Sequence, residues 1–202
     1  MAMIDGLPQD HTARSTSTGR APLIVGLAYA VCVSTIGCGE TRVDELAGEL
    51  ESVNANTRYQ AARSLDALGD EAVEAVGALT RALDDESPKV RYRAAKTLAK
   101  IGLQAAPAVN ALTARLQDDD ANVRYYAAKA LKEIGPQSAP AVEALTAAIK
   151  DEDPKVRYYA VRAIRSIGAE AESAIPALRK AIKDKDEKVR RAAIKALKDF
   201  EP

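Results

Sequence analysis

The sequence predicts an all-α solenoid, a stack of helix pairs that repeats every 33 residues, and three observations support this prediction. The dipeptide Val-Arg recurs in register at Val90-Arg91, Val123-Arg124, Val156-Arg157 and Val189-Arg190. A glycine closes the first half of each unit, at Gly69, Gly102, Gly135 and Gly168. The second half carries an aliphatic residue in phase, at Val76, Val109, Val142 and Ile175. A fixed period of this length is typical of stacked repeat proteins.

The first half of each unit is predicted to form an amphipathic helix. In the unit that starts at Val123, the apolar residues Ala127, Leu131 and Ile134 follow at the helical period. Residue types that cap helix N-termini precede the first halves, at Asn54, Ser87, Asp120, Asp153 and Asp186. The glycines at the other end are typical C-terminal stops. Caps, apolar stripe and stops therefore agree on one helix.

The second half of each unit is predicted to form a second helix. Val142, Leu145 and Ile149 share one of its faces, and prolines stand close to its start at Pro107 and Pro140. Neither helix can bury its apolar face alone, so the units must stack on one another. The predicted solenoid covers residues 41–202, as a half unit 41–56, full units 57–89, 90–122, 123–155 and 156–188, and a half unit 189–202.

Residues 1–40 are predicted to form an export signal. Arg14 and Arg20 precede an uncharged run from Ala21 to Gly39, which is short for a membrane-spanning helix. The end of this run, Thr35-Ile36-Gly37-Cys38, resembles the lipobox of bacterial lipoproteins, and the resemblance implies a lipid on Cys38. It also implies a location at a membrane of the bacterial cell envelope. An uncleaved membrane anchor, cleavage at another site and a chance apolar stretch are the alternatives.

The repeats themselves resemble a known family. The run Asp151-Glu152-Asp153-Pro154-Lys155-Val156-Arg157, with a later Ile-Gly, resembles the HEAT repeat, in particular the bacterial PBS-lyase HEAT-like variant. The resemblance implies antiparallel helix pairs in a right-handed stack, with the first helices convex and the second helices concave. It also implies a buried ladder in which an aspartate lies six residues before each arginine, at Asp85/Arg91, Asp118/Arg124, Asp151/Arg157 and Asp184/Arg190. The first unit departs from this pattern, with Ser52 before Arg58.

The composition limits the chemistry that the repeats can perform. The only histidine, His11, and both cysteines, Cys32 and Cys38, precede the repeats. The solenoid therefore lacks imidazole and thiol groups for catalysis or metal binding, and we expect no catalytic residue, no metal and no cofactor. Acidic clusters such as Asp118-Asp119-Asp120 are interpreted as helix caps at the positive end of the helix dipole rather than as calcium ligands.

One surface of the first helices is a candidate binding site for a partner. The third position of these helices, counted from the Val of Val-Arg, lies nearly opposite the apolar stripe and holds Tyr59, Tyr92, Tyr125 and Tyr158. The seventh position lies on the same side and includes Lys96, Lys129 and Arg162. Tyrosine and arginine are favoured at interface hot spots, so this column could bind a partner. Alternatively, the tyrosines stack on basic side chains of neighbouring units, at roughly 0.5–1 kcal/mol each.

These observations predict a non-catalytic scaffold that binds another protein and is exported and tethered to a membrane. Two alternatives stay open. One is an enzyme, or enzyme subunit, resembling the bilin lyases that contain HEAT-like units. The other is nucleic-acid binding through the basic C-terminal units, since residues 150–202 hold 14 basic and 10 acidic side chains. The 29 basic and 29 acidic residues of the whole chain argue against a dedicated nucleic-acid binder.

Overall fold

The computed structural model describes residues 38–200 of the chain, which belong to one compact unit. These residues form ten α-helices and no strand, so the predicted all-α solenoid is confirmed. The apolar run predicted to be an export signal lies outside the described residues as far as Gly37, and Cys38 is the first residue of α1 (Cys38–Glu49). None of the described helices is both long enough and apolar enough to cross a membrane.

The first half of each unit is a single α-helix of 14 residues. We call these the first helices: α2 (Ala55–Leu68), α4 (Pro88–Ile101), α6 (Ala121–Ile134), α8 (Pro154–Ile167) and α10 (Glu187–Phe200). The predicted capping side chains accept backbone N–H groups at Asn54, Asp120, Asp153 and Asp186. Ser87 is the N-cap residue of α4 as predicted, but its side chain makes no cap bond. Its carbonyl oxygen accepts the N–H of Val90 instead, at 3.0 Å.

The second half of each unit is divided, where the sequence predicts one helix. A 3-10 segment of seven residues comes first, as in Gly102–Ala108 and Gly135–Ala141. A short α-helix follows, and we call these the second helices: α3 (Val76–Ala82), α5 (Val109–Ala114), α7 (Val142–Ala148) and α9 (Ile175–Ala181). Pro107 and Pro140 lie inside two of the 3-10 segments, and the same division occurs without proline in Gly69–Ala75 and Gly168–Ala174.

A glycine in a left-handed conformation joins the two halves. Its φ lies between 66° and 78° at Gly69, Gly102, Gly135 and Gly168. Glycine adopts this conformation without the steric penalty of a Cβ, and it commonly ends helices in this way. The chain therefore reverses direction at the same repeat position in every unit.

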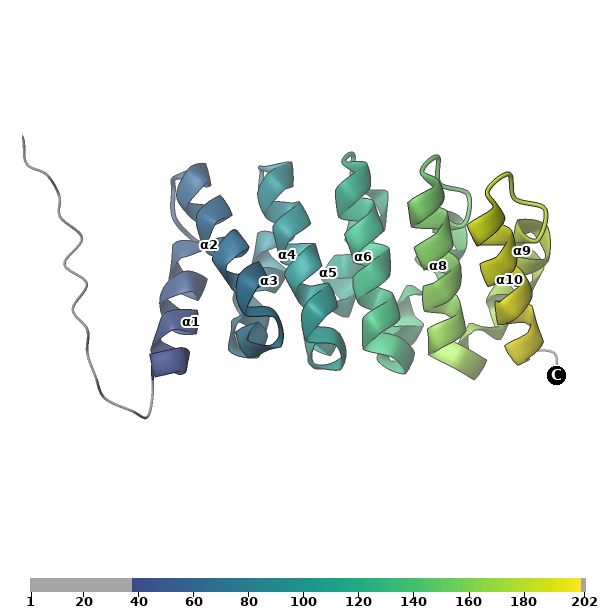
Figure 1. The fold of residues 1–202 in the computed structure, drawn as a ribbon, viewed down its shortest axis with the longest axis horizontal. Helices are drawn as coiled ribbons and strands as arrows, with labels where there is room; N and C mark the ends of the chain where they lie inside the picture. Colours follow the sequence, from purple (N-terminus) through teal and green to yellow (C-terminus); the bar gives the residue numbers. More distant parts are fainter. Residues whose placement is uncertain (1–37, 201–202) are drawn as a thin grey trace, which may run out of the picture. The chain divides into compact units, whose positions relative to one another are not determined.

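The helices form two layers (Figure 1). The first helices lie side by side in chain order, with α4 packed against α6 and α6 against α8. The second helices lie behind them, and each one packs against the first helix of the next unit, as α7 does against α8. Helix α1 occupies the place of a second helix at the start of the stack, with Val43 and Leu50 buried.

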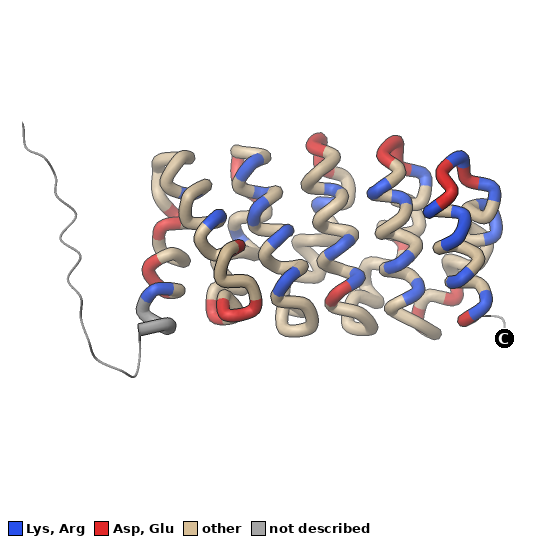
Figure 2. Tube along the Cα trace, viewed as in Figure 1, with Lys and Arg blue, Asp and Glu red and all other residues tan. Residues whose placement is uncertain are grey.

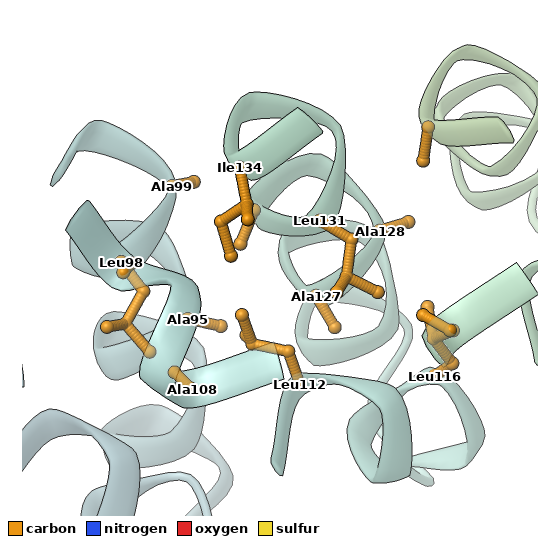
Figure 3. Packing of buried hydrophobic residues seen from close by; sticks show 14 of the residues in the cluster. Ala95, Leu98, Ala99, Ala108, Leu112, Leu116, Ala127, Ala128, Leu131 and Ile134 are labelled. Carbon is orange, nitrogen blue, oxygen red and sulfur yellow. The ribbon is translucent and has the colours of Figure 1, made fainter. Parts of the chain in front are cut away.

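The core runs continuously between the two layers (Figure 3). Leu98, Leu112 and Leu131 are fully buried and meet at the junction of successive units. Alanines such as Ala95 and Ala127 are also fully buried. Because a methyl side chain is small, it allows neighbouring helix backbones to approach closely, and the first helices can then form one compact layer.

Candidate interaction surface

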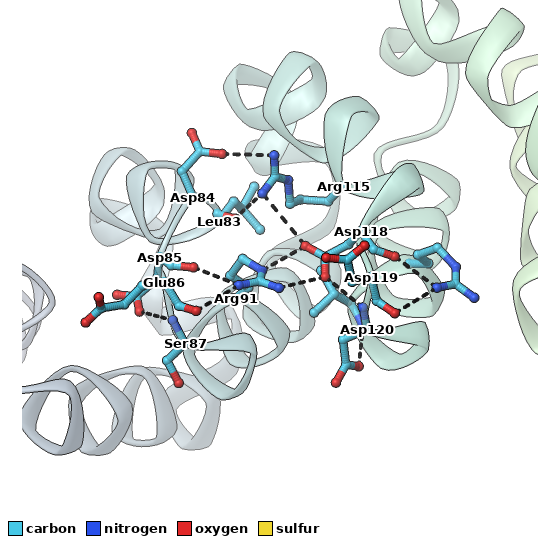
Figure 4. Close-up of polar contacts among 12 residues, drawn as sticks. Leu83, Asp84, Asp85, Glu86, Ser87, Arg91, Arg115, Asp118, Asp119 and Asp120 are labelled. Carbon is cyan, nitrogen blue, oxygen red and sulfur yellow. Dashed lines mark hydrogen bonds and ion pairs between the residues drawn. The ribbon is translucent and has the colours of Figure 1, made fainter.

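An arginine near the start of α2, α4, α6 and α8 binds an aspartate in the loop that ends the same unit, 27 residues later. The Nε and Nη2 groups of Arg91 donate to the two carboxylate oxygens of Asp118, at 2.7 and 2.8 Å (Figure 4). The same paired contact joins Arg58 to Asp85, Arg124 to Asp151, and Arg157 to Asp184. Both side chains of each pair are largely buried. Such two-point contacts are strong and fix the orientation of both groups.

The ladder is therefore connected differently from the prediction. The aspartate six residues before each arginine contributes its backbone carbonyl and not its carboxylate, as in the 2.9 Å bond from Nη1 of Arg91 to the oxygen of Asp85. The first unit takes part as well, because the carbonyl oxygen of Ser52 accepts the same kind of hydrogen bond from Nη1 of Arg58, at 2.9 Å. Among residues 38–200, Arg190 has no carboxylate partner and ends the ladder.

Each ladder aspartate also organises the loop that it occupies. Its Oδ1 accepts the N–H two residues later, for example Asp120 N to Asp118 at 3.0 Å. The same bond forms at Asp85, Asp151 and Asp184. Burial alone would raise the pKa of Asp118, but the bonds from Arg91 and from the backbone of Asp120 outweigh it and hold that pKa below its ordinary value. Much of the acidic charge between the units is thus neutralised inside the protein.

The four predicted surface tyrosines lie on the first helices, but they are half-buried. Tyr126 and Tyr159 connect three of them into a chain of edge-to-face contacts: Tyr92–Tyr126 at 5.2 Å, Tyr126–Tyr125 at 4.6 Å, Tyr125–Tyr159 at 5.1 Å and Tyr159–Tyr158 at 5.1 Å between ring centroids. Burial, with the neighbouring Tyr159, raises the pKa of Tyr125 to about 12. The tyrosines thus hold adjacent units together on this surface.

The three predicted surface cations also make contacts within the protein. The guanidinium of Arg162 lies 5.4 and 5.5 Å from the ring centroids of Tyr158 and Tyr159. The ammonium of Lys129 lies 5.6 Å from the ring centroid of Tyr126. Both are within the range of cation–π attraction.

Lys96 has a different partner, the buried Asp66 of the preceding first helix, at 2.7 Å. Arg93 and Lys100 bind the same carboxylate, each at 2.7 Å. Arg93 also lies 5.7 and 5.2 Å from the ring centroids of Tyr59 and Tyr92, so it takes the place that the sequence analysis gave to Lys96. A cluster of opposite charges that forms in only one unit leaves no periodic pattern in the sequence, whereas the regularly spaced tyrosines do.

The sequence analysis missed three lysines that remain exposed on this surface, Lys89, Lys155 and Lys188. They share one repeat position, directly before Val-Arg, and Asn122 occupies it in the unit between. No ion-pair partner is found for them within the described part of the chain. Periodicity could have revealed them, but only the arrangement of the helices shows that they stay unpaired.

These lysines line three successive grooves along α4, α6, α8 and α10, which we call the first-helix channel. The grooves have volumes of about 460, 480 and 320 Å³. The first and second share Tyr125 and Lys155, and the second and third share Tyr158 and Lys188, so they are neighbours in one row. Figure 2 shows basic residues spread along the first helices and many acidic residues in the loops between units. The channel can therefore receive an elongated anionic ligand.

Two repeat families match the sequence. HEAT repeats match residues 43–132 and 142–201, and the PBS lyase HEAT-like repeat matches residues 123–151. No curated protein sequence matches the chain.

Several solved structures share the fold. An engineered protein superposes with a TM-score of 0.69 at 25% identity, over 82% of this chain and 85% of its own. A designed armadillo repeat protein in complex with the peptide (KR)4 gives a TM-score of 0.71 at 22% identity, over 79% and 82%. The complex of CpcE and CpcF of phycocyanin lyase from Nostoc sp. PCC7120 gives 0.63 at 24% identity, over 92% and 70%.

The ladder can be tested with one substitution. Asp118→Asn keeps an oxygen for the N–H of Asp120 but removes the charge that binds Arg91. Because this leaves a largely buried arginine without its carboxylate, we expect the free energy of unfolding to fall by about 3 kcal/mol in urea titrations. The matched control is Asp119→Asn, whose side chain is exposed and which should change it by less than about 0.5 kcal/mol. Equal effects of the two substitutions would contradict the assigned role of Asp118.

The ladder also predicts how stability depends on pH. The pKa values of Asp118 and Asp184 are lowered because the bonds from Arg91 and Arg157 outweigh the effect of burial. The unfolded chain therefore takes up protons first, so this stabilisation is present above about pH 4 and is lost as the pH falls further. We expect the melting temperature to drop steeply between about pH 4 and pH 2, and less steeply in the Asp118→Asn variant. Parallel curves for both proteins would contradict this assignment.

Proposed function

Because the chain belongs to the HEAT-repeat family, we propose that it is a non-catalytic scaffold that binds a protein partner through the surface of its first helices. The observation that supports this proposal is the first-helix channel, a row of three adjacent grooves lined by tyrosine and basic side chains across four helices. Aromatic and arginine side chains in a hollow are typical of the residues that contribute most to protein binding.

The rigidity of this surface also supports a binding role. The ladder joins each unit to the next, and the edge-to-face tyrosines add contacts between α4, α6 and α8 on the outer side. A surface that is ordered before binding loses little conformational entropy when the partner arrives. A scaffold needs this property more than a set of reactive groups.

The solved structures of the same fold favour an interaction role without naming the partner. One of them, the designed armadillo repeat protein, is in complex with a peptide. The phycocyanin lyase subunits share the fold at an identity too low to transfer their activity. The repeats of this chain hold neither histidine nor cysteine, and we therefore propose a role without catalysis.

We also propose that the scaffold is exported and held at a membrane of the bacterial cell envelope by a lipid on Cys38. The support comes from the sequence, in which an uncharged run follows Arg20 and ends at a lipobox-like Cys38. Cys38 is also the first residue of α1, so a lipid there would attach directly to the start of the solenoid. Each buried methylene of such a lipid adds about 0.8 kcal/mol to membrane attachment.

Site-specific cross-linking tests the interaction role. A photoreactive amino acid at Lys155 lies in the channel, whereas the same probe at Lys150 lies in the loop between α7 and α8, outside it. In intact cells we expect irradiation to give a defined adduct with one protein from position 155 and none from position 150. Identical adducts at both positions, or none at either, would remove the proposed binding surface.

Lipid labelling tests the membrane attachment. Cells given radioactive palmitate should label the wild-type protein, and the Cys38→Ala variant should lose the label and leave the membrane fraction. Cys32→Ala is the matched control and should keep the label, because Cys32 precedes the lipobox-like segment. Unchanged labelling of the Cys38→Ala protein would exclude lipidation at this residue.

A further inference from the structure

The charge of the first-helix channel is strongly uneven. Seven lysine and arginine side chains of the described residues line its three grooves, against the two carboxylates of Asp120 and Asp186. Both carboxylates already accept backbone N–H groups as helix caps. The channel therefore presents unbalanced positive charge to a ligand.

The positive charge of the channel increases toward its C-terminal end. The groove between α8 and α10 is lined by five basic side chains and by no carboxylate of the described residues. Two of the five, Arg165 and Arg191, are paired with Asp199 and Glu187. Lys188 has no such partner among residues 38–200, and Arg162 rests against tyrosine rings. These two cations remain able to bind an anionic group.

The shape and composition of the channel favour a peptide over a nucleic acid or a membrane. The tyrosine rings contact one another edge to face and also contact Lys129 and Arg162, so they are not free to stack on bases. The large exposed apolar side chains among the described residues are Val53, Leu103 and Ile194, and none of them lines the channel. The channel thus lacks the protruding apolar groups that enter a membrane interface.

The repeat sets the spacing of a matching ligand. Packed helices lie about 8–10 Å apart, and an extended chain in the polyproline II conformation advances about 3.1 Å per residue and places every third side chain on the same side. One unit of the solenoid therefore corresponds to about three residues of an extended peptide. An acidic residue at every third position would meet Lys89, Asn122, Lys155 and Lys188 in turn, and the amide of Asn122 can also donate to a carboxylate.

We propose that the first-helix channel binds an extended acidic segment of the partner protein, with aspartate or glutamate at every third residue. This inference rests on the proposed function as an interaction scaffold and adds the chemistry of the partner. Charge complementarity of this kind mainly sets specificity and the rate of association, and it weakens as salt is added.

A binding experiment with defined peptides tests this proposal. The full-length chain, solubilised in detergent, is titrated into a fluorescent 12-residue peptide with four glutamates at every third position among serine and glycine. A second peptide has the same composition with the glutamates in one block, and a third has lysine in place of glutamate. We expect the spaced peptide to bind at least about fivefold tighter than the block and the lysine peptide not to bind, with affinity falling as salt rises.

Paired charge reversals locate the binding site. Lys155→Glu with Lys188→Glu should weaken binding of the spaced peptide by about tenfold or more. The matched control is Lys150→Glu with Lys183→Glu, which makes the same charge change at exposed residues 33 positions apart, outside the channel. Circular dichroism checks that both variants fold. Equal binding of the spaced and block peptides, or equal loss in both variants, would overturn the proposal.

Competition separates the peptide from other anions, and cross-linking separates this inference from the proposed function. Stronger binding of a single-stranded RNA of equal charge, or of vesicles containing anionic lipid, would overturn the assignment to a peptide.

If the Lys155→Glu, Lys188→Glu protein still cross-linked its cellular partner from another channel position, the scaffold function would stand and the acidic segment would be wrong. If the spaced peptide bound but no cellular adduct formed, the channel chemistry would stand and the proposed function would fail.

Discussion

The paired bond between an arginine and the aspartate 27 residues after it is the constraint on which the rest of the structure depends. Each arginine contacts the carboxylate ahead of it and the carbonyl of the loop behind it, so it joins two loops. In a solenoid each unit contacts only its neighbours, and stability is approximately a sum of unit and interface terms. A repeated polar bond at each interface therefore sets how every helix lies against the next, and with it the shape of the first-helix channel.

The same bond explains how a chain of zero net charge can present a basic surface. The ladder aspartates accept bonds from arginines and backbone N–H groups, so their charge is neutralised within the loops. The lysines directly before Val-Arg have no such partner in the described chain and face the channel. Net charge is a property of the whole chain, whereas binding depends on the charge left exposed at one surface.

The ladder also defines the two ends of the stack. Ser52 stands where later units have aspartate, so the first unit offers no carboxylate at that position to the arginine of another copy. At the other end, Arg190 retains its carbonyl contacts but has no carboxylate partner among the described residues. Both ends of the described stack therefore differ from its internal units.

The sequence by itself determined the helices, their period and the buried positions, because these depend on local patterns. The stripe through Leu131, the stops such as Gly135 and the caps such as Asp120 all act within a few residues, and they were found before any coordinates. The family resemblance correctly indicated a ladder of arginine and aspartate. Ser87 also stands at its predicted cap position, at the start of α4, although its side chain makes no cap bond.

Only the tertiary structure decided which distant groups meet. Arg91 has one aspartate six residues before it and another 27 residues after it, and the sequence cannot rank them because only the folding of the unit's second half back along its first helix brings Asp118 close. The pairing of Lys96 with Asp66 was hidden as well. Whether a surface cation is free for a partner depends on what packs beside it, and that is determined by how neighbouring units stack rather than by the order of residues within one unit.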